Sequence, residues 1–125
     1  MKRLLALLFI LAFPVLAQSP TSAQFAWTYA FNSAYPVACT ASVTTNCVQS
    51  FILSQGGTTV ATVPATSATS YTYKLTTLPA PGTYTYTLVA VGAFQGGTIQ
   101  SLPVTVSLQV PGQPVAPSGF TVVLQ

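Results

Sequence analysis

The sequence predicts an all-β protein that folds as a two-sheet antiparallel sandwich. Short segments with alternating apolar and polar residues recur along the chain, and Gly or Pro residues separate them. No amphipathic helical pattern of useful length follows the first 17 residues. The remainder of the 125-residue chain is long enough for one domain with a buried core.

Six strands are expected from these patterns. In the first strand Phe25 and Trp27 alternate with small or polar residues, so they share one face. Gly56 and Gly57 separate the second strand from the third and predict a hairpin. Pro103 in the last strand indicates an edge position or a bulge, because proline cannot donate a ladder hydrogen bond. The expected strands span residues 24–31, 48–55, 58–63, 70–75, 83–91 and 98–110.

The first 17 residues are predicted to be a cleavable secretory signal peptide. Lys2 and Arg3 precede an apolar run over residues 4–16, and Ala17 supplies the small residue expected before a cleavage site. The run is short for a membrane span. We therefore expect a mature chain that starts at Gln18, is secreted to the extracellular space or the cell surface, and is not inserted in the membrane.

The composition excludes several classes of function. The chain has no Asp, Glu or His, and two of its three basic residues lie in the predicted signal peptide. The remaining cation, Lys74, is expected to face solvent, and one lysine is too little charge for nucleic-acid binding. Acid–base catalysis and ordinary metal sites need the missing residue types. The sequence therefore predicts no enzyme, no metal site and no cofactor.

Cys39 and Cys47 are predicted to form a disulfide. They are an even pair in a chain with a predicted secretory leader, and the bond would close a short polar loop between the first two long strands. The alternative readings are a reactive thiol or an internal thioester with Gln49. No basic residue nearby would lower either thiol pKa, so these readings lack support.

Aromatic residues at the loops are the remaining candidates for ligand contacts. Tyr35 lies in the loop after the first strand, and Phe94 lies in the loop before the last one. An exposed pair of this kind suits stacking on sugar rings or anchoring a protein partner. The alternative reading is ordinary packing in the core or at strand edges.

Residues 23–110 resemble a fibronectin type III domain, the immunoglobulin-like sandwich found in secreted surface proteins of bacterial type. The Phe25-Ala26-Trp27 segment resembles the second strand of that family. Leu78 and the Pro81-Gly82 turn, with the alternating residues from Tyr84 onward, resemble its E-to-F corner and its F strand. The resemblance implies a fibronectin type III-like sandwich over residues 18–110, in which the Tyr84 hydroxyl bonds to nearby backbone at a structural corner.

The sequence departs from that family at both ends of the domain. Only residues 18–23 precede the first predicted strand, so the family's opening A strand is missing. Residues 111–117 form a Pro-rich linker, and residues 118–125 resemble an A strand. Three apolar residues share one face of this candidate donor strand: Phe120, Val122 and Leu124.

The spare strand predicts self-association. A sheet without its A strand exposes an edge that invites another strand. The linker reaches at most about 25 Å, so a return to its own domain is tight. We therefore expect an extracellular structural subunit of a fibre or surface layer, assembled head to tail by strand donation. The alternatives are a monomeric secreted adhesion or carbohydrate-binding module that uses Tyr35 and Phe94, and a truncated first domain of a multidomain surface protein.

Overall fold

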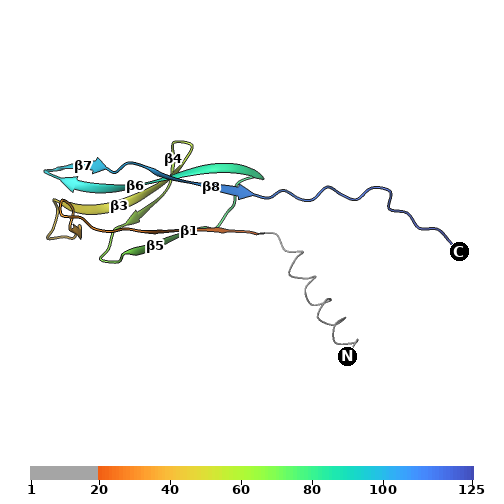
Figure 1. Cartoon of the computed structure of the whole chain (residues 1–125), viewed down its shortest axis with the longest axis horizontal. Helices are drawn as coiled ribbons and strands as arrows, with labels where there is room; N and C mark the ends of the chain where they lie inside the picture. The colour runs from red at the N-terminus through yellow and green to blue at the C-terminus, as the bar shows by residue number, and fades with distance from the viewer. Residues whose placement is uncertain (1–19) are drawn as a thin grey trace, which may run out of the picture.

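The structure, a computed structural model, describes residues 20–125 and contains eight strands in two sheets, with no helix in this part of the chain (Figure 1). The prediction of an all-β, two-sheet fold is confirmed. The predicted signal peptide lies outside the described residues. In chain order the strands are β1 (Ala23–Thr28), β2 (Val37–Ala38), β3 (Cys47–Gln55), β4 (Thr58–Pro64), β5 (Ser70–Leu75), β6 (Gly82–Phe94), β7 (Gly97–Gln100) and β8 (Val104–Val110).

The smaller sheet consists of β1 and β5, which pair antiparallel. Trp27 lies opposite Tyr71, and Phe25 lies opposite Tyr73. Burial alternates along β1, as expected for a strand with one face on a core. The apolar face of this sheet therefore points towards the larger one.

The larger sheet is four strands wide. Its centre is the long antiparallel pair of β3 and β6. Because β6 occupies one edge of β3, both β2 and β4 pair with the other edge. On the far side, β8 and β7 pair with successive parts of the outer edge of β6. The hairpin between β3 and β4 turns at Gly56 and Gly57, both of which have positive φ.

Aromatic packing joins the two sheets. Phe51 on β3 is 1% exposed, and its ring centroid lies 4.6 Å from that of Tyr71 and 5.7 Å from that of Trp27. The Phe25 ring lies 4.8 Å from that of Tyr86 on β6. These contacts place β5 and β1 over the central strands β3 and β6.

The expectation of six strands is wrong in two places. The last expected strand, 98–110, is two strands, β7 and β8, with Pro103 in the gap between them. There the Ser101 hydroxyl accepts a hydrogen bond from the Ala90 N–H, which replaces a ladder bond. In addition, the short strand β2 pairs parallel to β3 immediately before the loop that the disulfide closes. The first strand also ends at Thr28 instead of residue 31.

Residues 111–125 contain no strand and extend away from the sandwich beyond β8 (Figure 1). The start of β1 and the end of β8 lie at the same end of the sandwich. We call this end the exit end. The hairpin between β6 and β7 lies at the opposite end, which we call the entry end.

Candidate functional site

The predicted disulfide between Cys39 and Cys47 is confirmed. The two Cα atoms are 4.9 Å apart, and Cys47 is fully buried. The chain has no other cysteine, so neither sulfur is available as a thiol or for a thioester. The bond fastens the loop that carries β2 to the start of β3, where the Cys39 N–H also donates to Val48 O at 2.8 Å.

Two tyrosine hydroxyls bind backbone. The Tyr84 hydroxyl donates to Ala80 O at 2.6 Å, four residues upstream. The Tyr71 hydroxyl lies 2.7 Å from Ala68 O and accepts a hydrogen bond from the Thr66 N–H. Sequence reasoning missed this second role. The hydroxyl of a buried tyrosine usually needs a hydrogen-bond partner. The inward position of Tyr71 in its predicted strand could therefore have indicated that its hydroxyl bonds nearby backbone.

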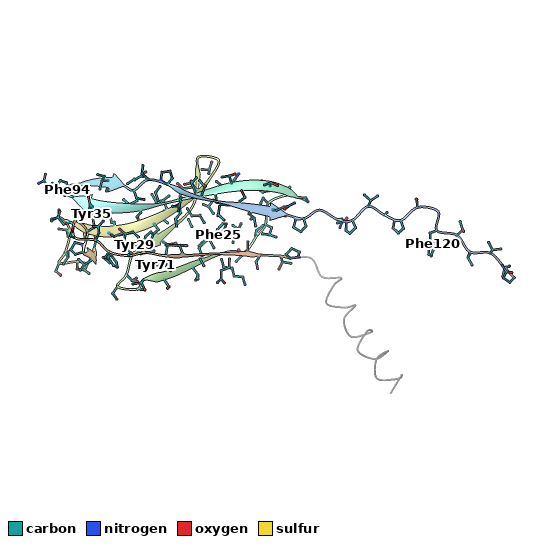
Figure 2. The ribbon with its side chains drawn as sticks, viewed as in Figure 1. Phe25, Tyr29, Tyr35, Tyr71, Phe94 and Phe120 are labelled. Carbon is teal, nitrogen blue, oxygen red and sulfur yellow. A yellow bond between two sulfur atoms is a disulfide. The ribbon has the colours of Figure 1, made fainter. Side chains whose placement is uncertain are left out.

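The structure does not bring Tyr35 and Phe94 into one pocket. Both lie at the entry end (Figure 2). The Tyr35 ring covers Gly92, where an added Cβ would lie 2.7 Å from the Tyr35 Cε1 atom. Tyr35 lines a pocket of about 210 Å³ that Phe94 does not line, while the Phe94 side chain is 47% exposed. We call this pocket, bounded mainly by Tyr29, Tyr35, Val48, Gly92, Ile99 and Ser101, the Tyr35 pocket.

The two sheets differ in width, and this leaves apolar surface uncovered. A two-stranded sheet faces one that is four strands wide. Since β1 and β5 lie over β6 and β3, no strand of the described residues 20–125 lies above the inner face of β8. Val104 and Val106 are 63% and 53% exposed there, although they pair with Leu88 and the buried Tyr86 on the inner face of β6. A third strand beside β1 would cover them.

A groove runs between β1 and β8 at this uncovered position. Its volume is about 210 Å³. Apolar side chains from both sheets line it, principally Phe25, Trp27, Leu53, Leu88, Val104 and Val106. Sequence reasoning did not find the valines of β8 or Ile99, because their exposure depends on which strand is absent above them.

Within residues 20–125, no strand pairs with the outer edge of β1. The Tyr29 N–H donates to Thr69 O at 2.8 Å, so the odd-numbered residues of β1 direct their backbone groups towards β5. The backbone N–H and C=O groups of the even-numbered residues therefore point towards the open edge; these residues are Gln24, Ala26 and Thr28. Among the described residues, the backbone hydrogen bonds outside paired strands involve none of these three. The edge offers three donors and three acceptors to another strand.

Three of the other outer strands, β4, β5 and β8, carry protection that β1 lacks. Charged side chains and prolines discourage pairing with a further strand. Lys74 lies on β5, Pro64 ends β4, and Pro103 precedes β8. No charged residue or proline lies in β1.

The candidate donor residues are all exposed. Phe120 is 94% exposed, Val122 is 93% exposed and Leu124 is 98% exposed. Figure 2 shows Phe120 far from the sandwich. The described chain thus holds an open strand edge beside an apolar groove, together with an extended segment whose apolar residues are unburied.

The electrostatics of the described residues are simple. Burial raises the pKa of Tyr29, with smaller contributions from Tyr35 and Tyr71, and burial also raises the pKa of Tyr86. Residues 20–125 hold no group of three or more metal-ligating side chains. The same residues form no helix that is long and apolar enough to cross a membrane.

Comparisons with protein-family models, with curated proteins and with solved structures found no match for this chain.

Proposed function

We propose that the protein is an extracellular structural subunit that assembles head to tail into a fibre or surface layer. Each copy donates residues 118–125 to the open β1 edge of the next copy. The observation that carries this proposal is the unpaired edge of β1 beside an apolar groove of about 210 Å³. Strand addition supplies main-chain hydrogen bonds along such an edge and pockets for alternate side chains.

The arrangement fits a fibronectin type III-like sandwich that lacks its A strand. In that assignment β1 and β5 take the places of strands B and E. The larger sheet supplies C from β3, C′ from β4, F from β6, and G from β7 and β8 together. The vacant position beside β1 is then the place of strand A. The sequence supplies a segment with the A-strand pattern only at residues 118–125.

Burial of the donor face supplies a driving force. Phe120, Val122 and Leu124 are almost fully exposed in the free tail. Moving each such side chain into an apolar site contributes about 1.5–3 kcal/mol. The same strand would cover Val104 and Val106 of the acceptor, so both partners lose exposed apolar surface.

The direction of the chain favours a neighbour as acceptor. The tail leaves at the exit end, whereas a strand antiparallel to β1 has to begin at the entry end (Figure 1). Within one molecule the seven-residue linker would have to run back along the sandwich and then reverse, with a reach of at most about 25 Å. Its three prolines make it stiff. A second copy placed end to end receives the strand without any reversal.

Two further features of the chain support an extracellular location. The predicted leader at residues 1–17 is of the secretory type. The Cys39–Cys47 disulfide suits an oxidising compartment.

The test compares the mature chain, residues 18–125, with variants by light scattering and electron microscopy over a range of concentrations. We expect polymers from the mature chain and monomers after deletion of residues 118–125. Val122→Asp should also abolish assembly because it buries a charge, whereas Val123→Asp places the same charge on the opposite face and should assemble. A mature chain that stays strictly monomeric at high concentration would contradict the proposal, as would polymers that survive the deletion.

A further inference from the structure

We infer that the donated segment binds a second copy in one register, in which Phe120 fills the Tyr35 pocket and Val122 and Leu124 fill the groove between β1 and β8. The inference rests on the proposed strand donation. It adds a role for the Tyr35 pocket, namely the site that receives the largest donor side chain and fixes the register.

The Tyr35 pocket and the groove are two parts of one track. β1 and its continuation at Tyr29 form one wall of both cavities. The segment from Ile99 to Val106 forms the other wall, through Ile99 and Ser101 at the Tyr35 pocket and through Val104 and Val106 at the groove. A strand that enters at the entry end meets the Tyr35 pocket first and the groove second.

Strand geometry restricts the donor to registers that differ by two residues, and two of these set Phe120 opposite the part of the track from Trp27 to Tyr29. Residues directly opposite each other in an antiparallel pair lie on the same face of the sheet. The inward donor residues therefore lie opposite the inward residues of β1, which are odd-numbered. One register sets Phe120 opposite Trp27, and the other sets it opposite Tyr29.

The shapes of the cavities favour the second register. With Phe120 opposite Tyr29, an aromatic side chain enters the Tyr35 pocket, and Leu124 lies opposite Phe25 within the groove. With Phe120 opposite Trp27, the small side chain of Ser118 would face the Tyr35 pocket and leave most of its volume unfilled. Leu124 would then lie opposite Ala23, which does not line the groove.

The outward residues favour the same register. The backbone groups of three residues point towards the open edge, namely Gln24, Ala26 and Thr28. Each of these residues would therefore form a hydrogen-bonded pair with the donor residue opposite it. In the second register Thr28 meets Thr121, and Ala26 meets Val123. Threonine pairs on a sheet face are favourable. The first register would place Thr121 opposite Ala26 and Val123 opposite Gln24.

Gly119 supplies an independent indication. Its φ is +69°, which lies in the left-handed region and outside the strand region. In the second register Gly119 lies opposite Ala30, past the end of β1 at Thr28. In the first register it would lie opposite Thr28 and would have to change conformation to pair. The left-handed glycine thus fits a bend at the entry to the track.

Two cysteine double variants of the mature chain separate the registers. In a hydrogen-bonded pair the Cα atoms are about 5.5 Å apart, which a disulfide spans. Residues displaced by two positions along the strand are about 7–8 Å apart, which is too far. Thr28→Cys with Thr121→Cys should therefore give a covalent ladder under mild oxidation, and Ala26→Cys with Thr121→Cys should give at least tenfold less. Thr28 and Ala26 are both exposed, so neither change disturbs the core.

The outcome is measured by non-reducing gels, by mass spectrometry of the linked peptides and by electron microscopy. The native chain is the control for disulfide exchange at Cys39 and Cys47. A ladder from the Ala26 variant alone would overturn the register while leaving donation intact. Polymers without a ladder from either variant would overturn both registers, and a link within single chains would overturn the second copy as acceptor. If the native chain forms no polymer, the proposed function fails, and the register fails with it.

Discussion

Removal of the Cys39–Cys47 disulfide should lower the free energy of unfolding by about 2.5 kcal/mol. The cysteines are eight residues apart in the sequence. In the chain-entropy model, a cross-link lowers the entropy of the unfolded chain by about 2.1 + 1.5R ln n cal/mol/K, where n is the number of residues in the closed loop. For a loop of this length at 25 °C, the corresponding free energy is about 2.5 kcal/mol. For a domain of this size the loss should lower Tm by about 10 °C or more. The effect acts mainly on the unfolded chain, because the cross-link restricts the unfolded ensemble.

The assay is chemical denaturation of three samples: the oxidised protein, the reduced protein, and the Cys39→Ala/Cys47→Ala variant. The reduced protein keeps both sulfur atoms, so its difference from the oxidised protein isolates the cross-link. Cys47 is fully buried, so the alanine variant should lose further stability through the cavity left behind. A difference below about 1 kcal/mol between the oxidised and reduced proteins would refute the loop-entropy account.

Three further predictions concern stability. The free energy of unfolding should change by less than about 1 kcal/mol between about pH 3 and about pH 9, because the chain has no Asp, Glu or His. It should fall above about pH 10, because the folded state holds the Tyr29 and Tyr86 protons more tightly than the unfolded state does; a pH series of denaturant melts measures both. Gly92→Ala should cost about 1–3 kcal/mol by the same melts, because its Cβ would lie 2.7 Å from the Tyr35 ring; an unchanged midpoint would contradict this. Tyr71→Phe should cost about 1–3 kcal/mol, since it removes the hydroxyl that bonds loop backbone, and a loss no larger than for an exposed tyrosine would argue against that role.

Local patterns predicted most of the strands. The strand at residues 70–75 has the predicted bounds, because Tyr71, Tyr73 and Leu75 alternate without interruption. The hairpin at Gly56 and Gly57 also follows from local chemistry. β2 has only two residues, and it exists because β3 pairs with it, which no local pattern shows. The interruption between β7 and β8 depends on Ser101 meeting Ala90, eleven residues away.

The candidate site was only partly visible in the sequence. The alternation of Phe120, Val122 and Leu124 is local, and so is the lack of a strand pattern before residue 23. The Tyr35 pocket is not local, because it joins side chains from the end of β1, the following loop, β6 and β7. One signal was present: Gly92 lies within a strand, where glycine often marks the close approach of another group. In the structure that group is the Tyr35 ring.

The near absence of charge decides how assembly could be specific. Charged side chains usually steer encounter and exclude wrong partners, but Lys74 is the single charged side chain after the predicted leader. The correct partner and register must then be selected by the shapes of the cavities and by the alternation of apolar and polar residues along the paired strands. A slip of one residue would turn the apolar donor face to solvent, so alternation alone opposes it. A slip of two residues preserves alternation, so in the proposed assembly it is opposed by the fit of Phe120 to the Tyr35 pocket, by the position of Gly119, and by the places of Leu124 and Thr121 opposite Phe25 and Thr28. Phe120 and Gly119 should therefore matter most for order within the proposed polymer, whereas Val122, which lies opposite a groove residue in both registers, should matter chiefly for its stability.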